Sequence, residues 1–190
     1  TSDANFHGTD TIDFALTDNG NYGEGGTLTN QSLLNIIVLT ENDAPSISLS
    51  NSSPNILEDQ ESDLTGVSID DIDFLLDNNI TFNLQLDAEN GILSLKDSFN
   101  QDLLSNVQGD NSSSLTITGD RNTINNALNN LRYLSDLNFN GDENIHISLD
   151  DLGSNTGKAA LTTETDLSFT VQSVNDTPSS TPDLPDIEVN

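Results

Sequence analysis

The chain has 190 residues and carries 32 acidic side chains against 4 Lys and Arg, a formal charge of −28 at pH 7. So few cations cannot neutralise a phosphate backbone or an anionic bilayer, which argues against nucleic-acid and membrane-surface binding. No apolar run approaches the roughly 18 residues of a membrane-spanning helix, so insertion into a membrane is not expected. Cysteine is absent, which excludes disulfides and thiolate metal sites.

The acidic excess needs positive charge from elsewhere. Carboxylate and amide oxygens are ligands for hard cations, Ca²⁺ first and Mg²⁺ second. On composition alone, a solvated acidic surface explains the charge equally well.

The sequence repeats itself at a spacing of 133 residues. Residues 2–45 align with residues 135–178 without a gap, and 16 of 44 positions are identical, among them Gly20 with Gly153. A fixed internal period is the mark of a tandem array. We therefore expect the C-terminal half of a preceding repeat at 1–45, one complete repeat at 46–178, and the start of a following repeat at 179–190.

Alternating apolar residues predict β-strands along most of the chain, about seven or eight of them in the complete repeat. A signal typical of a hairpin turn, Asn90-Gly91, separates two of these strands. In chain order, the predicted strands lie at 12–16, 46–50, 65–69, 80–86, 91–95, 114–118, 145–149 and 167–171.

One segment departs from this alternation. In residues 123–131, Ile124, Ala127, Leu128 and Leu131 recur at helical spacing, which predicts one short amphipathic helix. Short antiparallel strands punctuated by turns predict an all-β fold of two sheets packed as a sandwich. Tandem copies would then lie end to end as beads.

Oxygen-bearing side chains recur at the expected repeat junctions. Asn42-Asp43 is followed by Pro45, and Asn175-Asp176 by Pro178. Taken alone, this pattern is better explained as a plain turn, because Asn, Asp and Pro are common turn residues.

A second group of acids follows the predicted strands. Asp71 and Asp73 come at the end of one strand, and Asp151, with Gly153 after it, at the end of another; Asp18 is the copy of Asp151. A solvated loop is the simple explanation. Acidic loops gathered at one pole of a sandwich would nevertheless repel one another unless a cation bridged them.

Together these motifs resemble the cadherin family, and more closely the cadherin-like repeats of very large bacterial surface adhesins. They are also similar to repeats of the chondroitin-sulfate-proteoglycan type. The resemblance implies an Ig/cadherin-like antiparallel sandwich with one short helix per repeat, an extracellular location, cell adhesion, Ca²⁺ as the cofactor, and adjacent repeats or other cell-surface molecules as partners. The residues that carry it are Asn42-Asp43 with Pro45, Asp71-x-Asp73, Asp151-x-Gly153 and Leu57-Glu58-Asp59.

The same resemblance implies shared calcium sites. At the first junction the ligands would be Asn42, Asp43, Asp71, Asp73 and Asp151. At the far junction, Glu58, Asn175 and Asp176 would supply one half of a site, and Asp120 stands where the family has Asp-Arg-Glu, with Asn122 in place of the Glu. Thr40 and Ser173 replace the first Asp of the family linker, so we expect fewer ions than the family's full set, or ions that are bound more weakly.

No catalytic motif is present, and neither histidine, His7 nor His146, has the setting of a catalytic residue. The sequence thus predicts a non-enzymatic, calcium-rigidified extender module. Two alternatives stay open. One is a recognition module that binds another repeat or a carbohydrate. An exposed apolar patch would favour this alternative; the sequence shows none, and Tyr22, in a predicted loop, is the candidate contact residue. The other is an acidic spacer that needs no metal.

Overall fold

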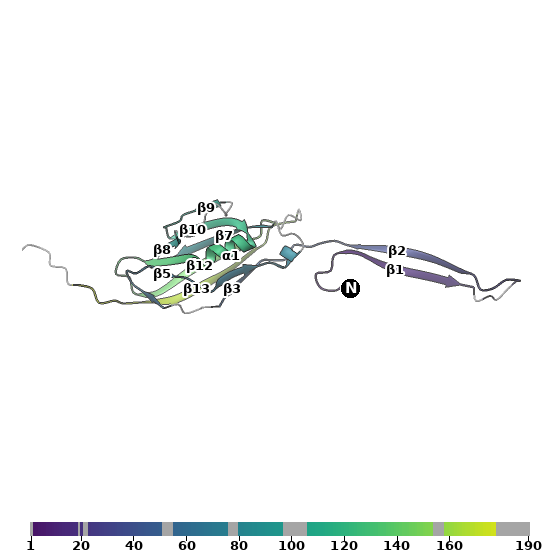
Figure 1. The fold of residues 1–190 in the computed structure, drawn as a ribbon, viewed down its shortest axis with the longest axis horizontal. Coiled ribbons are helices and arrows are strands. Elements are labelled where there is room, and N and C mark those ends of the chain that lie inside the picture. The colour runs from purple at the N-terminus through teal and green to yellow at the C-terminus, as the bar shows by residue number, and fades with distance from the viewer. Residues whose placement is uncertain are drawn as a thin grey trace, which may run out of the picture.

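The computed structural model describes residues 2–18, 20, 23–50, 55–75, 80–96, 106–153 and 158–177. These residues form a two-stranded hairpin and a β-sandwich, joined by an extended linker at 39–45 (Figure 1). Tyr22, Pro178 and the segment 179–190 lie outside the described residues. Within the described ranges, no helix has the length and apolar character needed to cross a bilayer.

The sandwich packs a six-stranded sheet, ordered β4-β13-β12-β7-β10-β9, against two smaller sheets, β5-β11-β8 and β3-β6. Every pair is antiparallel except β4 with β13. The expected all-β sandwich with one short α-helix is therefore confirmed. The described residues contain more strands than predicted, and two of these strands, β4 and β5, are only two residues long. The strands are β3 Ser46–Leu49, β4 Ile56–Leu57, β5 Ser62–Asp63, β6 Val67–Asp70, β7 Thr81–Ala88, β8 Gly91–Leu95, β9 Asn106–Gln108, β10 Ser114–Asp120, β11 Leu131–Ser135, β12 Gly141–Asp150 and β13 Thr162–Gln172.

The core forms because strand side chains alternate between the two faces of a sheet. On β7, Phe82, Leu84 and Leu86 point inward and are at most 1% exposed. Across the core, the ring of Tyr133 on β11 meets the ring of Phe169 on β13 edge to face, with centroids 5.3 Å apart. The buried residues of all three sheets and the helix form one cluster, so the sandwich folds around a single core.

The predicted short helix is present as α1, Arg121–Leu128, and buries Ile124, Ala127 and Leu128. Its first turn is capped by Asp120, whose Oδ1 accepts hydrogen bonds from the backbone N–H groups of Asn122 and Thr123 at 2.9 and 3.0 Å. Such a cap satisfies two of the backbone donors that the start of a helix leaves without partners.

This cap predicts a pH-dependent contribution to stability. Burial alone would raise the pKa of Asp120, but the hydrogen bonds from Thr123 and Asn122 outweigh it and hold the pKa below its ordinary value. The contribution is therefore complete above the unfolded pKa of about 3.9 and is lost as the pH falls through the lower folded pKa. We expect Asp120→Ala to lower the free energy of unfolding by about 1 kcal/mol at pH 7, and by clearly less at pH 2. Urea unfolding at both pH values measures this, and an equal loss at both would contradict it.

The turn at Asn90-Gly91 exists but does not make a hairpin. β7 pairs with β10 and β12, whereas β8 pairs with β11, so the chain crosses here from one sheet to the other. The buried carboxylate of Glu143 fixes the crossing, since it accepts hydrogen bonds from the N–H groups of Glu89 and Asn90 at 2.8 and 2.9 Å. The predicted turn is present, but a local turn signal does not specify which strands then pair.

The Tyr133 hydroxyl completes this crossing. It lies 2.9 Å from both the Glu143 carboxylate and the Asn90 carbonyl oxygen. Burial, together with the neighbouring Glu143, raises the pKa of the Tyr133 hydroxyl above its ordinary value. The hydroxyl therefore stays protonated and can donate.

The hairpin consists of β1, Gly8–Thr17, and β2, Thr29–Val38. Its register is that of β12–β13 shifted by the 133-residue period. Gly8 lies opposite Val38 just as Gly141 lies opposite Val171, and all ten pairs of the hairpin keep this correspondence. The repeat found in the sequence is thus also a repeat of backbone structure, while its division into three domains remains a prediction.

Candidate metal centre

Three acidic side chains lie near one another at the end of the sandwich where the linker enters. Asp71 lies between β6 and the 3-10 turn Ile72–Leu75, Asp73 is in that turn, and Asp151 follows β12. They are buried, with exposed fractions of 3%, 3% and 1%. The structure therefore brings together the acids that the sequence assigned to the first junction.

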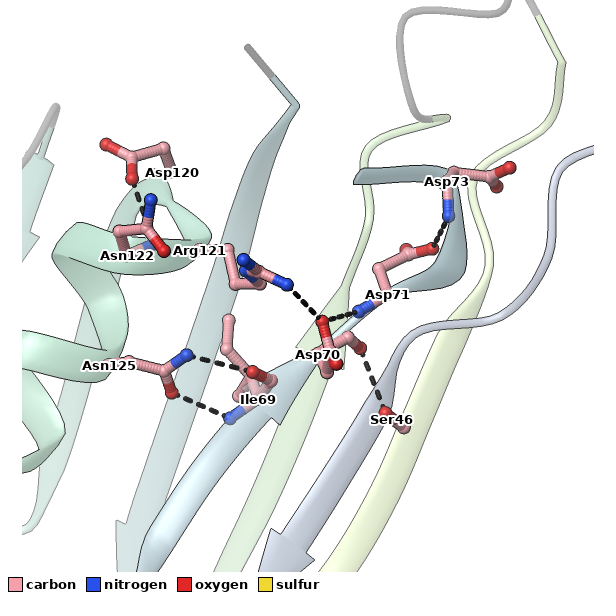
Figure 2. A network of polar contacts seen from close by, with 9 residues as sticks. All are labelled: Ser46, Ile69, Asp70, Asp71, Asp73, Asp120, Arg121, Asn122 and Asn125. Atoms are coloured by element: carbon pink, nitrogen blue, oxygen red, sulfur yellow. Dashed lines mark hydrogen bonds and ion pairs between the residues drawn. The ribbon is translucent and has the colours of Figure 1, made fainter. Parts of the chain in front are cut away.

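The short turn after β6 positions two of these acids (Figure 2). Asp71 Oδ1 accepts a hydrogen bond from the backbone N–H of Asp73 at 2.8 Å, the Asx arrangement that favours a turn. Asp73 Oδ2 in turn accepts from the backbone N–H of Asp43 at 2.9 Å. The linker is thereby attached to the sandwich through its backbone.

The loop after β12 attaches the linker a second time. Asn42 Nδ2 donates to Asp151 Oδ2 at 2.6 Å and to the Ala159 carbonyl oxygen at 3.1 Å. Asp151 Oδ1 accepts from the N–H of Gly153 at 2.8 Å. Gly153 has a φ of +84°, and a Cβ there would lie 2.7 Å from the Lys158 carbonyl oxygen, so this tight loop requires glycine.

Two buried oxygens of this group have no hydrogen-bond partner in the described structure, Asp71 Oδ2 and Asn42 Oδ1. A buried polar atom left in this way costs about 1–3 kcal/mol. Burial raises the pKa of Asp71 to about 6, and the charges of Asp73 and Asp151 add to the rise. Negative charge and unpaired oxygen atoms therefore accumulate at the same place.

The ion pairs at this end involve exposed carboxylates at its rim. Arg121 Nη1 lies 2.7 Å from Asp70 Oδ1, and the Asp70 side chain is 65% exposed (Figure 2). Lys158 Nζ lies 3.2 Å from the carboxylate of Glu41, which is 80% exposed. These pairs lie beside the buried acids, and exposed pairs of this kind contribute little to stability.

The donor set fits a hard cation. Calcium takes about 6–8 oxygens at roughly 2.3–2.6 Å, from carboxylates, amides, backbone carbonyls and water. The two unpartnered atoms are a carboxylate oxygen and an amide oxygen. As the side chains stand, no three carboxylate or imidazole groups of the described residues converge closely enough to hold a metal by themselves. Asn42, backbone carbonyls and water would therefore have to complete the coordination shell.

The predicted residues of the far junction lie at the opposite end of the sandwich. Glu58 is 3% exposed, and its two oxygens accept from the Val174 N–H at 2.8 Å and from Asn140 Nδ2 at 2.9 Å. Asn175 and Asp176 follow Val174 and are exposed. Their role in metal binding remains a prediction.

The remaining two candidates are Asp120 and Asp18. Asp120 pairs with Thr81, and Asp150 pairs with Asn83, so Asp120 lies at the first junction's end of the sandwich rather than the far end. Its placement at the far junction was therefore wrong, and its carboxylate caps α1 instead. Asp18 lies beyond Thr17, at the tip of the hairpin and away from the linker.

The hairpin also brings residues to the junction that the sequence did not single out as candidate ligands. Asp3, Asn5 and His7 line a cavity of about 370 Å³ together with Asp43 and Asp73. The internal repeat could have identified these residues from the sequence, through the positions of their copies. Their copies around residues 136–140 lie beside the far-end acids, where the Asn138 N–H donates to Asp59 Oδ1 at 2.9 Å.

Comparison with protein families gives a partial match. Residues 74–159 are similar to the Protein GAMETE EXPRESSED 2 domain, which is less than half of the chain and includes neither the linker nor Asp71 and Asp73. A comparison with curated proteins gives no match.

One solved structure is weakly similar. Its title is "Complete structure of manganese lipoxygenase of Gaeumannomyces graminis and partial structure of zonadhesin of Komagataella pastoris". The identity is 13%, the alignment covers 86% of this chain and 57% of that chain, and the TM-score is 0.36. A likeness at this level does not establish a shared fold.

Proposed function

We propose that the chain is a non-enzymatic, calcium-binding extender module of a large extracellular adhesion protein, built from cadherin-like repeats. The partial family match supports an adhesion-related surface domain and says nothing about calcium. The calcium proposal rests on one observation, the unpartnered oxygens of Asp71 and Asn42 buried among three carboxylates.

The mechanism is mechanical. The cation supplies the positive charge that lets buried carboxylates stay ionised side by side. The chain's own residues do the rest. Asn42 and Asp43 hold the linker to the end of the sandwich through Asp151 and Asp73. Charges act over only about 8 Å at physiological salt, so coordination at close range is needed to fix the linker, and diffuse counter-ions cannot do it.

Isothermal titration with CaCl₂ tests this proposal, and the repeat offers a matched control. Asp151 and Asp18 occupy equivalent turns with equivalent backbone hydrogen bonds, but only Asp151 lies beside Asp71 and Asp73. We expect Asp151→Asn to weaken calcium binding at least tenfold and Asp18→Asn to leave it unchanged. Equal effects of the two substitutions would favour a metal-independent acidic spacer instead.

A further inference from the structure

The hairpin exposes an apolar face that the described part of the chain leaves open to solvent. On β1, Ile12, Phe14 and Leu16 are 42%, 52% and 76% exposed, and on β2, Leu34 and Ile36 are 48% and 39% exposed. Ile12 lies directly opposite Leu34, so the apolar residues of the two strands share one face. An isolated two-stranded hairpin is at best marginally stable, and this one needs a partner for its face.

The repeat shows what kind of partner covers such a face. The equivalent residues of β12–β13 are almost completely buried, with Ile145, Ile147 and Leu149 each at 0%, Leu167 at 2% and Phe169 at 6% exposure. The apolar pattern is therefore the same in the two hairpins, and only the covering differs.

The cover of β12–β13 has three parts. β7 pairs antiparallel along β12, from Asn83 opposite Asp150 to Ala88 opposite Ile145. β4 pairs parallel with the end of β13. The smaller sheets pack on the inner face, where the Tyr133 ring lies against Phe169.

The hairpin already has the geometry to accept the same cover. At its tip, Asp18 Oδ1 accepts from the Gly20 and Leu28 N–H groups at 2.9 and 3.0 Å, and Asp151 Oδ1 accepts from Gly153 and Leu161 at 2.8 and 2.9 Å. At its base, Asn5 and its copy Asn138 both adopt a positive φ, 59° and 58°. The turn, the strand register and the backbone conformation at the base of the hairpin therefore match those of β12–β13 before any partner binds.

We propose that the β1–β2 face is a docking surface for a further repeat body, a polypeptide segment with the strand pattern of residues 46–134. Its β7-like strand pairs antiparallel with β1 between Ile12 and Thr17, presenting apolar side chains at the positions of Phe82, Leu84 and Leu86. Its β4-like strand runs parallel to β2 beside Val38. The proposal rests on the repeat arrangement and not on calcium, so its failure would leave the metal site standing.

A second copy of the hairpin is a poorer partner. Facing hairpins would leave unpaired the outer edges that correspond to those which β7 and β4 occupy in the sandwich. Unpaired strand edges cost hydrogen bonds that a repeat body supplies.

A transplant within the full chain tests the fit. Residues 135–178 are replaced by a copy of residues 2–45, with the transplanted Asp10→Glu supplying the carboxylate of Glu143 that holds the β7–β8 crossing. We expect a cooperative urea transition and at least about 100-fold slower amide exchange in the transplanted strands than in β1–β2 of the unaltered chain. The control carries Phe14→Asp and Leu34→Asp in the transplanted copy and should lose this protection.

Two results would overturn the proposal. One is a transplanted chain that shows no cooperative transition, since the body would then not accept the hairpin. The other is an unaltered chain that sediments as a dimer with protected β1–β2 amides, with Phe14→Ser making it monomeric and unprotected. A second copy, and not a repeat body, would then be the partner of this face.

Discussion

Calcium is expected to raise the thermal stability of the sandwich strongly, and the double variant Asp71→Asn/Asp73→Asn is expected to abolish the rise. A ligand that binds only the folded state adds RT ln(1 + [L]/Kd), about 2.7 kcal/mol at 100 times Kd. The gain should be calcium-selective, because the site offers flexible carboxylate, amide and carbonyl oxygens rather than the small octahedral shell that Mg²⁺ requires. Thermal unfolding in millimolar CaCl₂, in MgCl₂ and in EDTA measures it.

In EDTA, the same double variant is not expected to lose stability. Without a cation, the buried Asp71 and Asp73 carboxylates are unfavourable, because burial and the neighbouring charges of Asp73 and Asp151 raise the cost of ionising Asp71. Removing their charge should leave the sandwich at least as stable as the parent chain. A variant that is less stable in EDTA, or that keeps the calcium-dependent rise, would contradict the assignment of these acids to a metal site.

Gly91→Ala is expected to cause a large loss of stability, although it adds only one methyl group. A Cβ at this position would lie 2.5 Å from Tyr133 Cε2 and 2.6 Å from the Leu134 carbonyl oxygen. Neither neighbour can move freely, since Tyr133 is fully buried and Leu134 belongs to β11. We expect the free energy of unfolding to fall by about 3 kcal/mol, as in overpacked cores.

Urea unfolding at constant calcium checks this, with Gly26→Ala as the control. A Cβ on Gly26 would meet nothing within 4 Å, so the control should leave stability within about 0.5 kcal/mol of the parent. A small effect of Gly91→Ala would mean that the β7–β8 crossing is looser than the packing of Tyr133 indicates.

Secondary structure that depends on the spacing of nearby side chains could be predicted from the sequence. The alternation of Phe82, Leu84 and Leu86 predicted a strand with one buried face, and the helical spacing of Ile124, Ala127 and Leu128 predicted α1. The 133-residue period went further, because equal side chains at equal spacing imposed the same strand register on both hairpins.

Features that depend on the pairing of strands far apart in the chain could not be predicted from the sequence. The Asn90-Gly91 turn looks the same whether the next strand pairs with β7 or joins another sheet, and the Glu143 carboxylate that fixes the outcome lies more than fifty residues away. Asp120 was assigned to the far junction for a similar reason, since its position follows from the pairing of β10 with β7. The uncovered face of β1–β2 was missed because alternation shows which residues are apolar and not whether anything covers them.

In the proposed mechanism, one cation joins the linker to the end of the sandwich. A crystal structure of the chain grown in CaCl₂, with anomalous difference density to identify calcium, tests this most directly. We expect an ion at about 2.3–2.6 Å from Asp71 Oδ2 and Asn42 Oδ1, with Asp73 or Asp151 among its other ligands. Calcium bound only by exposed acids, with Asp71 Oδ2 still lacking a partner, would contradict it.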